Sequence, residues 1–185
     1  MEYIVTYMGE EFTPLNPDIE KIHIEDIAHS LSLLCRANGH LDRFFSIAQH
    51  CINCAAEAKA RGYNTGVQLV CLIHDASEAY ISDITRPVKH YLSEYKKIEK
   101  RLQDVIYTKF LGSPPSEENF LLMNQIDNDM LIWEFDTLMT RTKIYDTVPK
   151  LASKPIYERS DFKQVERLFL KVYYGIMHAG LIQGR

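Results

Sequence analysis

Two adjacent polar residues, His74 and Asp75, directly follow an unbroken apolar run, LVCLI. A run that is apolar on all sides belongs to a buried helix. A buried carboxylate normally pairs with a cation or binds a metal, because an unpaired buried charge is strongly destabilising. Glu78 lies four residues after His74 and three after Asp75, so on a helix it stands beside both. This stretch predicts either a metal site with a free carboxylate beside it or a buried His–Asp pair.

A metal ion needs more ligands than His74 and Asp75 supply, so other segments must provide them. His50 lies in the preceding helical stretch, SIAQHCINCAA, and IDNDMLIWEF offers Asp127 and Asp129. Helical spacing puts Asp127 inside the apolar stripe of its helix and Asp129 on a more polar surface. An acid in the core-facing stripe needs a partner, whereas an acid on the polar surface is simply solvated. Asp127 is therefore the better ligand candidate.

Together these segments offer two imidazoles and two carboxylates from three helices: His50, His74, Asp75 and Asp127. A mixed nitrogen and oxygen set suits one divalent transition metal ion, Mn, Co, Fe, Zn or Ni. Such a site leaves coordination positions open for water and substrate.

A competing metal site would use the C-x-x-C pair of Cys51 and Cys54, which adjoins His50. A structural zinc site needs a second pair of ligands, and Cys35 and Cys71 are isolated from one another. We therefore expect four free, buried thiols and no disulfide framework.

The overall composition is that of a globular protein with one core. The chain has 185 residues, 46% of them hydrophobic, which predicts a single domain over residues 1–185. The net charge is −4 without a basic stripe, so long nucleic acid is not an expected partner. No apolar run reaches the ~18 residues that span a bilayer. Because MEYIVTYMGEEF also lacks the regions of a secretory signal, we expect a cytoplasmic protein that does not bind membranes.

Helical periodicity covers most of the chain and must position these side chains. The first 20 or so residues predict an irregular segment or a short β-hairpin, with Gly9 in the turn. Helices are expected over about 22–38, 45–61, from 65 through HDASEAY, from Pro87 to Gly112, 117–142 and 160–180, with a loop over 143–157. The sum is an all-α single domain, a bundle of about six helices.

The arrangement of these residues resembles that of the HD-domain phosphohydrolases. Their spaced H…HD…D signature matches His50, His74–Asp75 and Asp127. HDASEAYISDITRPVK resembles the HD-x-x-E…D…P-x-K segment of the bacterial 5′-deoxynucleotidases and their phage dNTP triphosphohydrolase relatives. IEDIAHSLSLLCRANGH with FFSIAQHC resembles the N-terminal part of that group, and IDNDMLIWEFDTLM resembles its fifth helix. The resemblance covers roughly residues 10 to 140 and implies an HD-domain helical bundle with the four metal ligands named above.

The resemblance also implies roles for further residues. Glu78 would act as general acid or base beside the attacking water, and Asp83 would support catalysis or orient that water. Arg36 matches an arginine that holds the substrate phosphate, although Arg43 is an alternative. Lys89 is a second candidate for a phosphate contact, but a lysine in the first turn of an exposed helix is more often solvated.

The implied activity is metal-dependent hydrolysis of a small nucleotide, with a nucleoside 5′-monophosphate as the leading substrate. The alternative is a dNTP cleaved to nucleoside and triphosphate. Ala37 follows Arg36 where the family has a deoxyribose-sensing Trp, so selectivity for 2′-deoxy sugars is not implied. A third possibility is a metal-bound helical module that acts only through a partner, which would not need Glu78 and Asp83.

Family members form dimers or larger assemblies, so the resemblance also implies a homo-oligomer. The apolar last helix, containing VERLFLKVYYGIM, could supply the interface between subunits. Alternatively, it completes the core of a single subunit.

Overall fold

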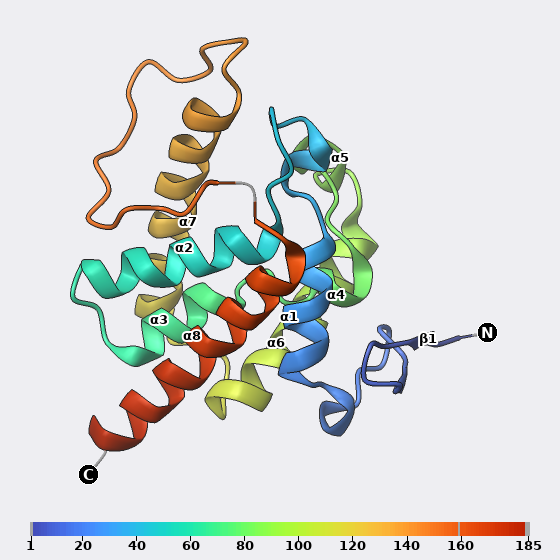
Figure 1. Cartoon of the computed structure of the whole chain (residues 1–185). Helices are drawn as coiled ribbons and strands as arrows, with labels where there is room; N and C mark the ends of the chain where they lie inside the picture. The colour runs from blue at the N-terminus through green and yellow to red at the C-terminus, as the bar shows by residue number, and fades with distance from the viewer. Residues whose placement is uncertain (1, 159, 184–185) are drawn as a thin grey trace.

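The computed structural model describes residues 2–158 and 160–183, and it is mostly helical (Figure 1). The described part contains six helices of nine residues or more: α1 (Ile24–Leu33), α2 (Ile47–Ala60), α3 (Thr65–Ile73), α6 (Ser93–Leu111), α7 (Glu117–Leu138) and α8 (Phe162–Gln183). Shorter elements are α4 (Glu78–Ile81), α5 (Arg86–Lys89), and the 3-10 turns η1 (Ile19–Lys21) and η2 (Arg36–Gly39). An antiparallel hairpin of β1 (Ile4–Val5) and β2 (Glu11–Phe12) precedes them. The predicted all-α bundle with a short N-terminal hairpin is confirmed.

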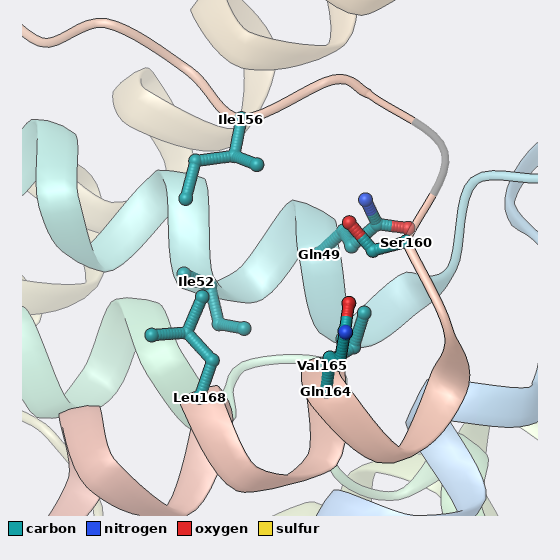
Figure 2. Close-up of a pocket in the computed structure, with 7 residues that line it drawn as sticks. All are labelled: Gln49, Ile52, Ile156, Ser160, Gln164, Val165 and Leu168. Carbon is teal, nitrogen blue, oxygen red and sulfur yellow. The ribbon is translucent and has the colours of Figure 1, made fainter.

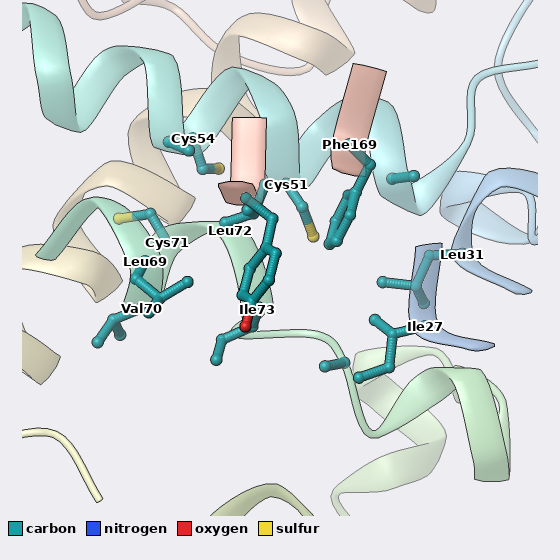
Figure 3. Packing of buried hydrophobic residues seen from close by; sticks show 14 of the residues in the cluster. Ile27, Leu31, Cys51, Cys54, Leu69, Val70, Cys71, Leu72, Ile73 and Phe169 are labelled. Carbon is teal, nitrogen blue, oxygen red and sulfur yellow. The ribbon is translucent and has the colours of Figure 1, made fainter. Parts of the chain in front are cut away.

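The core forms where α1, α2, α3 and α8 meet. Helix α3 contacts α2, α6, α7 and α8, as expected for a helix that is apolar on all sides. Figure 3 shows Leu31, Cys51, Leu72 and Phe169, one from each of the four helices, gathered in this core. Burying such side chains stabilises the fold by roughly 1.5–3 kcal/mol each.

The last helix completes this core. Its buried side chains are Val165, Phe169, Tyr173 and Ile176, and they recur at helical spacing on the side facing α1, α2 and α3. Tyr174 and Leu181 of the same helix are exposed. Of the two roles considered for VERLFLKVYYGIM, the structure shows that it completes the core. That the protein forms a homo-oligomer remains a prediction.

The predicted continuous helix from residue 65 through HDASEAY is wrong. Helix α3 ends at Ile73, residues 74–77 form tight turns, and α4 begins at Glu78. The cause is the side-chain amide of Gln103 on α6. Its Nε2 donates to the carbonyl of Ile73 (2.8 Å), and its Oε1 accepts from the amide of Ser77 (3.0 Å). In a continuous helix these two backbone groups would bond to each other, so the inserted amide interrupts the helix between them.

Other boundaries also differ from the predictions. The helix expected from Pro87 to Gly112 is divided into α5 and α6, with Pro87 in the first turn of α5 and Gly112 in a left-handed conformation (φ 82°) after α6. Helix α7 ends four residues earlier than expected, and α8 continues past Gly180. The predicted loop over 143–157 is confirmed, because the described residues 139–158 and 160–161, called here the 139–161 segment, contain no helix.

The 139–161 segment runs back along α2 (Figure 1), and three polar side chains of that helix hydrogen-bond to its backbone. Gln49, Asn53 and Glu57 are buried and spaced four residues apart, so they share one face of α2. Gln49 donates to the carbonyl of residue 158 (3.2 Å) and Asn53 to that of Ile156 (3.0 Å). Glu57 accepts from the amides of residues 152 and 153 at 2.9 and 2.8 Å. The segment is thus ordered by the helix that also carries His50.

Replacing Glu57 with Gln is expected to lower the free energy of unfolding by about 1.5–3 kcal/mol at neutral pH, because hydrogen bonds to a charged group are lost. Burial raises the pKa of Glu57, but hydrogen bonds from Ala152, Ser153 and Arg61 outweigh it and lower the pKa below its usual value. The folded pKa then lies below the unfolded one, so the carboxylate stabilises the fold above the unfolded pKa and this contribution is lost as the pH falls.

Denaturant unfolding at a series of pH values tests this prediction. The difference between wild type and the Glu57→Gln variant should shrink as the pH falls through the acidic range. Glu94→Gln is the matched control, because Glu94 is exposed and pairs only with the exposed Lys97. A difference that stays constant down to acid pH would contradict the assigned role of the Glu57 charge.

Candidate metal centre

The four predicted ligands converge from three parts of the chain. His50 comes from α2, His74 and Asp75 from the turn after α3, and Asp127 from the middle of α7. The Nε2 atoms of His50 and His74 lie 3.3 Å apart. The Oδ1 atom of Asp127 lies 3.0 Å from the first and 3.7 Å from the second. The Oδ2 atom of Asp75 lies 3.3 Å from Nε2 of His74 and 4.0 Å from that of His50.

These distances fit a shared cation. Nitrogen and oxygen ligands sit roughly 2.0–2.2 Å from a divalent transition metal, so neighbouring ligand atoms must lie ~3–3.5 Å apart. The separations above are close to that range. His50 is buried and the side chain of His74 is only 5% exposed, while Asp75 and Asp127 keep about a fifth of their side chains exposed (19% and 23%). The cluster is thus accessible to solvent at its two carboxylates.

Local sequence explains how His50 reaches this place. Ser46 and Gln49 form a capping box that starts α2 one turn before His50. The chain arrives there through an antiparallel bridge between Cys35 and Ser46, which also places Arg36 beside the start of the helix. The amide of Arg36 donates to the carbonyl of Phe45 (2.8 Å), so its backbone is held near the cluster.

The guanidinium of Arg36 lies inside the cluster. Its Nη1 is 3.5 Å from Asp75, its Nη2 is 3.5 Å from Asp127, and its Nε is 3.3 Å from Glu134. The alternative, Arg43, is exposed and lies outside these contacts. Of the two arginines proposed from the sequence, Arg36 is the one that the fold brings to the predicted ligands.

The electrostatic field of the cluster favours positive charge. Burial lowers the pKa of His74, but the nearby charges of Asp75 and Cys51 and the hydrogen bonds to Asp127 and Cys51 together raise it by more, well above the usual value. Burial and the charge of Arg36 lower the pKa of His50. Glu134 and Asp127 raise this pKa by a larger amount, so the net effect is a pKa above the usual value. A field that favours a proton on an imidazole also attracts a metal cation to it.

Sulfur atoms also approach the two imidazoles. The Sγ atom of Cys54 lies 3.5 Å from Nε2 of His50, and Sγ of Cys51 lies 4.0 Å from Nδ1 of His74. Two groups, His50–Cys54–His74 and Cys51–His74–Asp75, have ligand atoms within 4.8 Å of one another. Burial raises the pKa of all three buried thiols, Cys71 included, and this favours the neutral form over the thiolate that metals bind.

The prediction of four buried free thiols holds for three residues. Cys51, Cys54 and Cys71 are buried, and Cys35 is exposed. Cys35 follows the end of α1 at the bridge to Ser46, where its side chain is not covered by another helix. All four thiols are free.

Glu78 lies in a buried and negatively charged environment at the start of α4. Burial, together with the charges of Asp75 and Asp83, raises the pKa of Glu78 to about 10. Its Oε2 atom is buried without a hydrogen-bond partner. A carboxyl group with such a pKa carries a proton at neutral pH and can donate it.

The other predicted site residues lie around this carboxyl group. Lys89 of α5 is 2.7 Å from Glu99 and 3.6 Å from Asp83, so it is held in an ion-pair network and is less solvated than a free surface lysine. Asp83 is partly exposed. Asp129 is not simply solvated, contrary to the prediction, because it pairs at 2.8 Å with Arg61, the residue that follows α2.

Sequence reasoning missed the part played by Glu134. This residue is fully buried, and it accepts a hydrogen bond from Nδ1 of His50 at 2.8 Å. It follows Asp127 by seven residues, or about two helical turns, so it lies on the same face of α7. The sequence did contain a signal for this role, because Glu134 is an acidic residue in the same apolar stripe as Asp127 and two helical turns away from it.

A separate cavity of about 190 Å³ lies between α2, α8 and the 139–161 segment (Figure 2). It is lined by Gln49, Ile52, Ile156, Ser160, Gln164, Val165 and Leu168. None of the predicted site residues lines it. Its walls are mostly apolar, and it is distinct from the candidate metal centre.

The fold and the cluster define a helical protein with buried His, Cys and Asp groups positioned to hold a metal ion. The chain is 39% identical over 115 residues to the uncharacterized protein YfdR of Escherichia coli (strain K12), an alignment that covers 62% of this chain and 61% of YfdR. It is 34% identical over 109 residues to an uncharacterized protein of Rhodobacter capsulatus, covering 55% of each. The chain thus spans less than two thirds of the length of both relatives.

No family model matches the chain. Membership of the HD-domain superfamily accordingly remains a prediction from the motifs. Among the described residues, no helix is both long and apolar enough to cross a membrane.

Proposed function

We propose that this protein is a metal-dependent phosphohydrolase of the HD-domain type that acts on small nucleotides, with nucleoside 5′-monophosphates as its substrates. One observation carries the proposal. The Nε2 atoms of His50 and His74 lie within 3.0–4.0 Å of oxygens of Asp75 and Asp127, although these residues come from three segments that are far apart in sequence. Structural ion pairs rarely need two imidazoles and two carboxylates at one point, whereas a catalytic cation does.

The donor set indicates which ions fit. Imidazole nitrogen together with carboxylate oxygen suits one ion per chain of Mn, Co, Fe, Zn or Ni, and it disfavours Ca, which prefers oxygen alone. When bound, the cation would neutralise phosphoryl charge and make a water molecule easier to deprotonate at neutral pH. The residues of the chain would supply the remaining requirements of the reaction.

Arg36 would bind and orient the phosphoryl group. Its guanidinium is held by acids on three sides, and its planar set of donors matches phosphate oxygens. Positive charge fixed there would also offset negative charge that develops on the phosphoryl oxygens in the transition state. Asp83 and Lys89 would not contact the phosphoryl group directly. They would influence the reaction through their ion pair, which lies beside Glu78.

Glu78 would supply the proton. Hydrolysis forms a bond between a water oxygen and phosphorus and breaks the bond from phosphorus to the ribose 5′ oxygen. The leaving oxygen needs a proton, and a carboxyl group that is protonated at neutral pH can give it. The carboxylate then recovers a proton from the attacking water, so the protons balance over the cycle.

A nucleotide panel with product identification tests the proposal. We expect metal-depleted protein to be inactive, and protein resupplied with Mn²⁺ or Co²⁺ to release inorganic phosphate from nucleoside 5′-monophosphates. Release of triphosphate from dNTPs instead would assign the alternative substrate class. If neither product formed with any nucleotide and either metal, the enzyme proposal would fail in favour of a metal-bound interaction module.

A further inference from the structure

Glu134 contacts two functional groups of the candidate metal centre at once. One oxygen, Oε1, accepts from Nδ1 of His50 at 2.8 Å, and the other, Oε2, accepts from Nε of Arg36 at 3.3 Å. The side chain of Glu134 is completely buried, as is that of His50. Because burying a carboxylate is costly, both of its oxygens need such partners.

The contact with His50 determines which ring nitrogen faces the predicted metal. A carboxylate can only accept, so Nδ1 of His50 carries the hydrogen in this pair. The opposite nitrogen, Nε2, points to Asp127 at 3.0 Å and to His74 at 3.3 Å. The imidazole is thus held at both nitrogens, with Nε2 directed into the ligand cluster.

The contact with Arg36 determines where the guanidinium lies. With Nε bound to Glu134, the two terminal nitrogens of Arg36 point toward Asp75 and Asp127. A side chain with this many rotatable bonds would otherwise occupy many conformations. Glu134 therefore restricts a predicted ligand and the predicted phosphate-binding group through a single carboxylate.

We propose that Glu134 is the positioning residue of this site, which fixes the His50 imidazole for metal binding and the Arg36 guanidinium for phosphate binding. This inference rests on the proposed function, which identifies the two bound species as a metal ion and a phosphate group. Outer partners of metal-binding histidines typically change metal affinity or activity by ~10–100-fold when they are removed. A merely structural carboxylate would change stability and leave both binding steps intact.

The test uses the full chain with Glu134→Gln, which preserves size and leaves one acceptor oxygen for two donors. Mn²⁺ is titrated into metal-depleted protein, and inorganic phosphate is then titrated into the Mn²⁺-loaded protein. We expect the variant to bind Mn²⁺ ~10–100-fold more weakly than wild type and to bind phosphate more weakly as well. Asp129→Asn is the matched control, because Asp129 is on the same helix and pairs with an arginine away from the cluster; it should bind both probes as wild type does.

The outcomes separate the inference from the proposed function. If wild type hydrolyses nucleotides and Glu134→Gln binds Mn²⁺ and phosphate normally, the positioning role is overturned and the enzyme proposal stands. If wild type binds Mn²⁺ without hydrolysing any nucleotide, the enzyme proposal fails and the Mn²⁺ comparison still tests Glu134. Equal losses in Glu134→Gln and Asp129→Asn would also overturn the inference. Should Glu134→Gln not fold, Glu134→Asp keeps the charge on a shorter arm, and wild-type affinity for both probes would then refute the role.

Discussion

Replacing Asp75 with Ala is expected to abolish metal binding and nucleotide hydrolysis together. The Oδ2 atom of Asp75 lies 3.3 Å from Nε2 of His74, and it is one of the two carboxylate oxygens within 4.0 Å of the Nε2 atoms of both imidazoles. Loss of a direct ligand should exceed the ~10–100-fold effect of an outer partner, so Mn²⁺ affinity should fall beyond detection. Because Asp75 lies in a turn and is partly exposed, the helical content should be unchanged.

Calorimetric titration of Mn²⁺, phosphate release and circular dichroism on the same sample would measure the three quantities. Asp104→Ala is a suitable control, since Asp104 is an acid on α6 that pairs with the exposed Lys100. Full activity of Asp75→Ala in metal-depleted buffer would end the proposal of a metal-dependent enzyme.

Replacing Glu78 with Gln is expected to lower kcat by ~10²–10⁴-fold while Mn²⁺ binding is retained. Glutamine fills the same buried space but has no proton to give, and Glu78 is not among the groups whose ligand atoms converge. The effect should fall on kcat more than on KM, because the proton is needed in the transition state.

A change of leaving group makes this prediction sharper. p-Nitrophenolate leaves readily without protonation, so Glu78→Gln should lose little activity on p-nitrophenyl phosphate relative to a nucleoside monophosphate. An equal loss on both substrates would show that Glu78 does not act as the acid and would point to a structural or binding role.

Sequence reasoning predicted the all-α bundle because apolar periodicity and helix-ending glycines are local signals. It also singled out the four residues that the fold brings together, since a buried acid and histidine after LVCLI needed partners. It failed where a distant side chain decides the local structure. Nothing within residues 65–81 reveals that Gln103 will occupy the hydrogen bonds of Ile73 and Ser77.

The same limit explains the remaining differences at the site. The preference for Arg36 over Arg43 came from the resemblance, because the bridge between Cys35 and Ser46, which places Arg36, joins residues across a loop. Glu134 was visible as an acid in the apolar stripe of its helix, but its two partners come from other elements. The sequence shows which residue types each helix carries, but only the fold shows which of them contact one another across helices.

The amide of Gln103 has a consequence for how a mutation could disturb the candidate metal centre. Gln103 offers no ligand and belongs to a surface helix, yet its amide occupies the two backbone groups, of Ile73 and Ser77, that would bond to each other in a continuous α-helix. With an apolar residue at that position, Ile73 and Ser77 could bond directly, and the HD dipeptide would turn with the extended helix. Related sequences can therefore retain all four predicted ligands and still place the HD pair differently, depending on one amide thirty residues downstream of Ile73.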